Sequence, residues 1–143
     1  MKLYQYTGAD HAESIRHTGL KLGSIPLGDD VQGYHLLGPA QWLTDDADWQ
    51  NQGWATNILV DEDRTAVRFV VTIPWSHRQL LWHWPVLARQ VLKCSEDWIE
   101  NFNRAGGSAD GARWWVYLGH VPPGWLRGFE VKPVRVESER SDP

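Results

Sequence analysis

The sequence predicts a single domain of the α+β class rather than a series of βαβ units. Its 143 residues have the length of one ordinary domain, which is enough to bury a sizeable core. Two apolar segments, 65–73 and 113–118, predict strands, and apolar residues at helical spacing predict helices before and between them. We therefore expect one domain over residues 1–136, followed by a polar C-terminal tail over 137–143.

The first element is a short strand over residues 3–7. Along this segment Leu3, Gln5 and Thr7 alternate with Tyr4 and Tyr6, which is typical of a strand with two distinct faces. We therefore expect the Gln5 side chain to point away from the two tyrosine rings.

A short helix is expected next, over about 9–18. Asp10 and Glu13 have the spacing of an N-terminal capping pair, and Gly19 is a natural residue for the position just after a helix. The helix should therefore begin near Asp10 and end before Gly19.

The middle of the chain predicts one clear strand between two less regular segments. Residues 20–40 are rich in glycine and proline and predict a loop or short irregular strands, which could border a ligand site. Residues 41–44 predict a buried strand that stops at Asp45 and Asp46, whose short side chains favour turns and helix caps. The pattern over 47–60 favours neither a strand nor a helix.

The second half of the chain has the stronger signals. Residues 65–73 contain the best run of β-branched side chains in the sequence, and a proline ends that run. Helical spacing over 85–105 predicts a helix with a break near Ser95. Residues 113–118 and 129–136 predict the last two strands.

Charge and composition narrow the classes of function. The formal net charge of −4 argues against a duplex-DNA binder, because affinity for phosphates comes mostly from clustered Lys and Arg. Arg68 is interpreted either as an outward charge or as an anion contact. The single cysteine, Cys94, leaves no intramolecular disulfide, and the histidine spacing matches no common zinc pattern. We expect no metal site.

The sequence also bears on location. No apolar run approaches the roughly 18 residues of a membrane-spanning helix. The first residues lead directly into a strand rather than into the apolar core of a signal peptide. A cytoplasmic location is therefore expected, with no membrane partner.

The ten tryptophans allow two interpretations. Each indole buries about 150–250 Å², so the rings can fill the core of a small domain. They can also provide stacking faces for a base, a nicotinamide or a sugar ring. For most of them we expect the core role, because aromatic residues more often fill cores than sites.

A fixed order of short segments runs through most of the chain. Tyr-Gln-Tyr-Thr at 4–7, the helix over 9–18 and Gly-Leu at 19–20 precede Trp-Leu-Thr-Asp-Asp at 42–46. This series resembles the opening half of small ADP-ribosyltransferase-like domains, in which a Tyr-His-x-Thr strand precedes a helix and a Gly-Leu exit. Val-Pro-Pro-Gly-Trp-Leu at 121–126 is similar to the segment after the late strand of the DNA-targeting, DarT-like toxins of that superfamily. The whole chain also looks like small bacterial and phage proteins.

The resemblance implies an ADP-ribosyltransferase-like fold, with a split mixed β-sheet and flanking helices, and NAD as a co-substrate. Breaking the nicotinamide–ribose bond creates an oxocarbenium-like centre, so the site must hold the nicotinamide, orient the ribose and stabilise positive charge. By position in the family, Gln5 takes the ribose-binding role that many relatives give to His.

The resemblance places further cofactor-binding residues in the same cleft. An aromatic ring would stack on the nicotinamide, and its candidates are Tyr34, Trp42 and Trp49, although a tryptophan on a core strand also fits a structural role. The full set expected to bind NAD is Tyr6, Thr7, Tyr34, Trp42 and Thr44.

In the family, a late-strand Glu completes the site, and here the sequence departs from the pattern. Alignment on the Val-Pro-Pro segment places Trp114 or Trp115 at that position, and neither indole can act as a carboxylate. Glu100 and Glu130 are the available substitutes. We place Glu130 in the catalytic set with Gln5, because it lies on a predicted strand.

Two functions from different classes follow. The first is an ADP-ribosyltransferase-like domain that binds NAD and transfers ADP-ribose to a protein or nucleic-acid acceptor. The second is a non-catalytic protein-interaction module, an inhibitor or regulator in bacterium–phage conflict, favoured by the missing Glu and by the abundance of tryptophan. A single-stranded nucleic-acid binder is a third interpretation, against which the acidic balance argues. The oligomeric state is left open.

Overall fold

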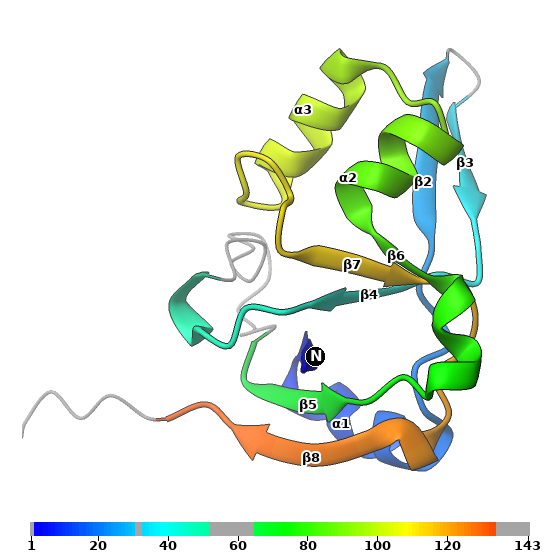
Figure 1. The fold of residues 1–143 in the computed structure, drawn as a ribbon. Coiled ribbons are helices and arrows are strands. Elements are labelled where there is room, and N and C mark those ends of the chain that lie inside the picture. Colours follow the sequence, from blue (N-terminus) through cyan, green and yellow to red (C-terminus); the bar gives the residue numbers. More distant parts are fainter. Residues whose placement is uncertain (1, 31–32, 52–64, 134–143) are drawn as a thin grey trace, which may run out of the picture.

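The computed structural model describes residues 2–30, 33–51 and 65–133. The described part of the chain forms eight strands and three α-helices, most of which are labelled in Figure 1. The strands are β1 (Leu3–Thr7), β2 (Ile25–Asp30), β3 (Gly33–Leu37), β4 (Gln41–Thr44), β5 (Val67–Val71), β6 (Leu81–His83), β7 (Trp114–Tyr117) and β8 (Leu126–Val131). The helices are α1 (Ala9–Thr18), α2 (Trp84–Val86), which continues as a π-helical turn over Leu87–Val91, and α3 (Glu96–Ala105). Together they confirm the α+β class.

One sheet organises the fold. Its strand order is β6-β7-β4-β1-β5-β8, and β2 and β3 form a separate hairpin. β1 pairs with β5 along its whole length, but with β4 only at Tyr4↔Thr44. The sheet is therefore split between β1 and β4. A mixed sheet was the wrong expectation, because all five strand pairs of this sheet run antiparallel.

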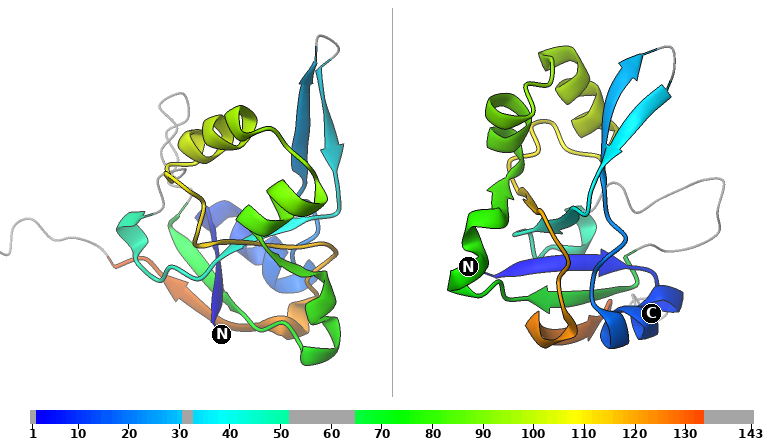
Figure 2. Two further views of the ribbon diagram at one scale, coloured as in Figure 1. Left: turned by 45° about the horizontal axis from the view of Figure 1, so that its top comes forward. Right: turned by 90° about the vertical axis from the view of Figure 1, so that its right-hand side faces the viewer.

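Two hydrophobic cores flank the sheet, on opposite faces of β4 and β7. The first packs α1 against β1 and β5, continues onto β4 and β7, and buries Leu3, Ala12 and Phe69. The second core joins the β6–β7–β4 half to α2, α3 and the hairpin through Ile25, Trp84, Leu87, Ile99 and Val116. Figure 2 shows the hairpin, α2 and α3 on the same side of that half. Because β1 meets β4 at a single register pair, the boundary between these two strands is available for a cleft.

The strand over 3–7 and the helix over 9–18 are confirmed. The expected capping pair is wrong, however, because Gly8 occupies the N-cap and no side chain bonds the helix start. Glu13 pairs instead with Arg16 and His17, one turn further along the helix. Gly19 ends the helix with φ of 79°, and a Cβ there would collide with the Val121 carbonyl oxygen. Glycine is therefore required at this position for two reasons.

Later elements follow the expected order with shifted bounds. The helical segment over 85–105 breaks at Ser95, whose hydroxyl caps α3 by accepting a hydrogen bond from the Trp98 backbone N–H at 3.2 Å. β8 begins at Leu126, three residues before the expected start, and residues 134–136 lie outside the described part of the chain. The ambiguous 47–60 segment is described only to residue 51.

Two strand regions were not specified by the sequence pattern. Residues 20–40, for which either a loop or short irregular strands was expected, contain the β2–β3 hairpin, which has a register shift between Leu27 and Asp30 and packs on the second core through Leu27 and Leu37. β6 has only three residues, and it pairs with β7 from Leu81↔Tyr117 to His83↔Trp115. A strand this short shows too few alternations to be recognised by periodicity.

Candidate functional site

A cleft of about 410 Å³ opens where β1 and β4 part. Its lining residues come from β1, β4, β7 and the end of α3. Half of them are aromatic, and the two polar non-aromatic ones are Gln5 and Thr44. None of the described lining residues is a carboxylate, an ammonium, a guanidinium or an imidazole. The aromatic wall consists of Tyr4, Tyr6, Trp42, Phe102 and Trp114.

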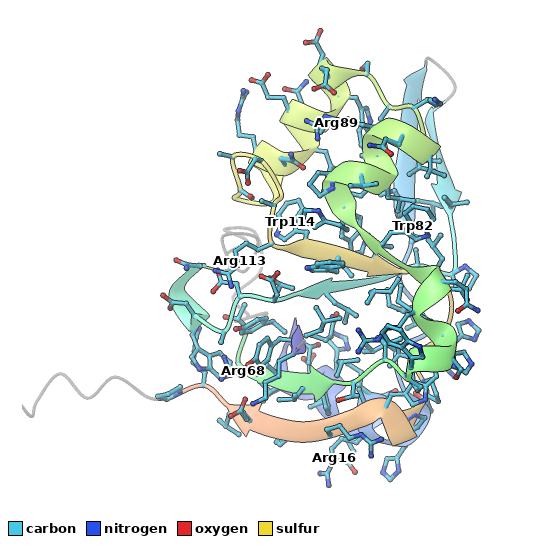
Figure 3. The ribbon with its side chains drawn as sticks, in the orientation of Figure 1. Arg16, Arg68, Trp82, Arg89, Arg113 and Trp114 are labelled. Atoms are coloured by element: carbon cyan, nitrogen blue, oxygen red, sulfur yellow. The ribbon has the colours of Figure 1, made fainter. Side chains whose placement is uncertain are left out.

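Three rings of this wall, those of Trp42, Phe102 and Trp114, pack against one another. The Trp42 ring centroid lies 5.4 Å from that of Phe102 and 6.1 Å from that of Trp114. The Trp114 plane is almost perpendicular to both, at 84° and 89°. Figure 3 shows Trp114 between α3 and the β7 strand. A Cβ at Gly106 would collide with the Trp114 ring, so glycine allows this close approach.

Trp42 has a structural role as well as a surface in the cleft. Its indole N–H donates to the Ser24 carbonyl oxygen at 2.9 Å, and its ring lies 4.8 Å from that of the buried Trp84. Because the N–H is already bonded, Trp42 can offer a ligand only its ring. This agrees with the structural role that the sequence allowed for a tryptophan on a core strand.

The polar groups of the cleft differ in their capacity to bind a ligand. The Thr44 hydroxyl donates to the Arg113 carbonyl oxygen at 3.0 Å and accepts from the Asp46 N–H at 3.1 Å. The Gln5 amide donates to the Tyr6 carbonyl oxygen at 3.3 Å, whereas none of the described residues bonds its side-chain oxygen. The Tyr4 hydroxyl likewise has no hydrogen-bond partner among residues 2–30, 33–51 and 65–133. Tyr4 and Gln5 are therefore the groups free to bond a ligand.

Behind Tyr4 and Tyr6 lies a network centred on Arg68, which β5 places opposite Tyr6 on β1 and Glu130 on β8. The guanidinium donates to the Glu130 carboxylate at 2.7 Å and to the Tyr6 hydroxyl at 3.1 Å. Its carbon lies 4.8 Å from the Tyr4 ring centroid and 4.4 Å from that of Trp49. Only 11% of the Arg68 side chain is exposed, so the outward charge that the sequence allowed is wrong.

The network also sets the protonation of its members. Burial raises the pKa of the Tyr6 hydroxyl, although the hydrogen bond and charge of Arg68 act to lower it. Burial acts to lower the pKa of Arg68, but hydrogen bonds with Glu130 and Tyr6 raise that pKa above its ordinary value. Arg68 therefore stays charged, which favours its pairing with the Glu130 carboxylate.

The structure brings four of the seven predicted site residues together in the cleft and leaves two outside it, while the side chain of the seventh, Tyr34, is not described. Gln5, Tyr6, Trp42 and Thr44 line the cleft. The others are Thr7, half-buried at the end of β1, Tyr34 on β3, whose side chain lies outside the described part, and Glu130 on β8, which β5 separates from β1.

The other residues considered from the sequence have partners of their own. Glu100 is exposed on α3 and pairs with Arg104 one turn away. The Trp49 ring packs edge-on against Tyr6, with centroids 5.3 Å apart. Trp115 donates its indole N–H to the Asp45 carboxylate at 3.0 Å. None of these side chains supplies the missing carboxylate of the cleft.

Sequence reasoning missed Tyr4, Phe102, Gly106 and Trp114 as site residues. A signal for Tyr4 was available, because alternation along β1 places it on the same face as Tyr6. The contribution of Phe102 and Gly106 had no sequence signal, because it depends on how the end of α3 meets β4 and β7.

The acidic segment after β4 forms a turn. The Asp46 carboxylate accepts hydrogen bonds from the Asp48 backbone N–H at 2.9 Å and from the Asn51 amide at 3.1 Å. This agrees with the turn and capping role expected for these aspartates. In the described part of the chain, no three His, Cys, Asp or Glu side chains gather as metal ligands.

Comparisons with known proteins do not add a family. No protein-family model, curated protein or solved structure matches the chain significantly. Within residues 2–30, 33–51 and 65–133, no helix has the length and apolar character needed to cross a membrane.

Proposed function

We propose that this chain is an ADP-ribosyltransferase-like domain that binds NAD in the cleft between β1 and β4. The observation that carries the proposal is the meeting of Gln5, Tyr6, Trp42 and Thr44 in one cleft, although they lie on two strands far apart in the sequence. A cytoplasmic location is part of this proposal.

The chemistry of the lining supports a ligand with a planar ring. Aromatic walls with a few convergent polar groups are typical of small-molecule sites, and the volume lies in their usual range of about 300–1,000 Å³. The free Tyr4 hydroxyl and the Gln5 amide offer a donor and an acceptor at the wall formed by β1. A carboxamide-bearing ring such as nicotinamide matches both the stacking surface and these polar groups.

The lining supports bond cleavage less than binding. Cleavage of the nicotinamide–ribose bond needs negative charge near the developing cation, and the described lining residues include no carboxylate. Glu130 would have to leave Arg68, to which it is bonded at 2.7 Å, before it could act on a ligand. We therefore propose NAD binding as the function of the cleft, and transfer of ADP-ribose as a further activity for which the described lining residues supply no carboxylate.

Titration with NAD, followed by calorimetry and by tryptophan fluorescence, tests the proposal. We expect saturable binding, and at least a tenfold weaker affinity for Gln5→Ala, since one polar contact contributes on the order of 1.4 kcal/mol. Gly106→Ala should weaken binding as well, because the new methyl group displaces the Trp114 ring. Gly124→Ala is the matched control, because a Cβ there meets no atom within 4 Å.

The controls make the result decisive. If Gly106→Ala and Gly124→Ala bind NAD with equal affinity, the NAD site must lie outside this cleft. No heat or quenching up to millimolar NAD, together with no label transferred from radioactive NAD to lysate components, would remove NAD as the ligand of this cleft.

A protein-interaction module is the second candidate, and one observation favours it. Trp75 is 83% exposed, and the Arg78 guanidinium lies 5.2 Å from its ring centroid. Exposed tryptophan and arginine are the side chains that contribute most often to binding between proteins. This surface does not include the residues that line the cleft.

Affinity purification with three forms of the protein distinguishes the two candidates. If the chain is an interaction module, wild type and Trp114→Leu should retain the same partner, and Trp75→Ser should lose it because the exposed indole supplies the contact. A partner retained equally by all three forms would show that Trp75 is not the contact.

A further inference from the structure

We propose that the cleft between β1 and β4 selects a planar organic cation over neutral and anionic rings of the same shape. The inference rests on the proposed function, because it concerns the ring that binds in that cleft. Two independent observations carry it, namely the faces of the aromatic wall and the pairing of the arginines beside the cleft.

The first observation is the composition and geometry of the wall. Trp42 and Phe102 lie within 32° of parallel, and Trp114 stands almost perpendicular to both. The faces of such rings carry the negative part of the aromatic quadrupole and attract a cation. Phe102 is itself stacked on Trp98 with centroids 5.1 Å apart, so a ligand can reach only the ring surfaces that line the cleft. A planar cation in contact with those surfaces gains an attraction that a neutral ring lacks.

The second observation is that the arginines next to the cleft have carboxylate partners. Arg68 lies opposite Tyr6 in the sheet and pairs with Glu130. Arg104 directly precedes the lining residue Ala105 and pairs with Glu100. Each positive charge is therefore balanced by a nearby carboxylate and is not directed at the ligand.

The third neighbouring arginine follows the same pattern. Arg113 directly precedes Trp114, and its guanidinium bonds the Asp45 carboxylate. The hydrogen bond and charge of Asp45 raise the pKa of Arg113, and the guanidinium also donates to the Asp45 carbonyl oxygen at 3.0 Å. An anionic ligand would lose its hydration on entering the cleft without gaining a cationic partner from the described lining residues.

Three pyridine rings of nearly the same shape test this selectivity. They are the N-methylated pyridinium form of nicotinamide, which is a cation, nicotinamide, which is neutral, and nicotinate, which is an anion at neutral pH. Each is titrated into the full chain by calorimetry and then used to compete with NAD. We expect the cation to bind about 3- to 30-fold more tightly than nicotinamide, the range given by a cation–aromatic contact, and nicotinate to bind most weakly.

Two variants connect the preference to the wall. Trp114→Leu should reduce the ratio between cation and neutral ring towards one, because it removes a ring face. Trp75→Leu removes an indole that is 83% exposed and does not line the cleft, so it should leave the ratio unchanged. An equal loss of preference in both variants would overturn the assignment of selectivity to the cleft.

The outcomes separate this inference from the proposed function. Nicotinate binding as tightly as the cation would overturn the selectivity, while NAD binding could still stand. If NAD binds but none of the three rings displaces it, the selectivity is also overturned, because NAD is then held in the protein by a group other than its nicotinamide ring. If NAD fails to bind while the cation binds most tightly of the three, the proposed function fails and the selectivity stands.

Discussion

Replacing Trp84 by alanine is expected to lower the free energy of unfolding by about 3–5 kcal/mol, the usual cost of removing a buried tryptophan side chain. Trp84 is fully buried in the core formed by β4, β7, α2 and α3. Its indole N–H donates to the Asn103 side-chain oxygen at 3.0 Å. The substitution therefore leaves both a cavity and an unpaired buried amide oxygen. Chemical denaturation followed by circular dichroism measures the change.

Two further variants calibrate this result. Trp84→Phe keeps most of the ring volume but loses the hydrogen bond to Asn103, so it should cost about 1–3 kcal/mol. Trp75→Ala removes an indole that is 83% exposed and should change stability by no more than about 0.5 kcal/mol. Similar losses for Trp84→Ala and Trp75→Ala would contradict the packing described for the second core.

Replacing Arg68 by methionine should lower the free energy of unfolding by about 2–4 kcal/mol, because hydrogen bonds from a charged group and contacts with aromatic rings are lost together. Methionine keeps much of the apolar stem, so the loss reports mainly on the guanidinium. Arg68 bonds the Tyr6 hydroxyl, the Glu130 carboxylate and the Ala47 carbonyl oxygen, and thus connects β1, β5, β8 and the turn after β4. Thermal and chemical unfolding measure the effect.

A double-mutant cycle with Glu130→Gln isolates the ion pair. The Glu130 side chain is 48% exposed, so its substitution alone should cost only about 1 kcal/mol. Once Arg68 is methionine, the same substitution should cost almost nothing, because the pair no longer exists. Fully additive costs would mean that Arg68 and Glu130 do not interact in solution.

This cycle also bears on the catalytic role predicted for Glu130. A structural partner of Arg68 should affect stability and leave NAD affinity unchanged when replaced by glutamine. If Glu130 instead acts on the ligand, its replacement by glutamine should lower the rate of ADP-ribose transfer. The geometry favours the structural role, because β5 lies between the strands of Glu130 and Gln5.

Local patterns in the sequence determined several elements of the fold. Alternation specified β1, β-branched residues specified β5, and Ser95 marked the start of α3. These signals depend on residues close together in the chain. They could not determine how strands pair, and the mixed sheet, which only the family resemblance implied, was wrong. The three-residue β6 was missed because it is too short to show a pattern.

For the site, the family resemblance named four side chains of β1 and β4 that line the cleft, Gln5, Tyr6, Trp42 and Thr44, but it did not name Tyr4 and it included Thr7, which does not line the cleft. Only the tertiary structure decided that the end of α3 lines the cleft with Phe102 and Gly106, and that Glu130, on β8 and beyond β5 from the cleft, pairs with Arg68. Periodicity records which face of a strand a residue occupies. It does not record which distant elements meet that face, because those contacts are selected by packing and charge pairing between segments far apart in the chain.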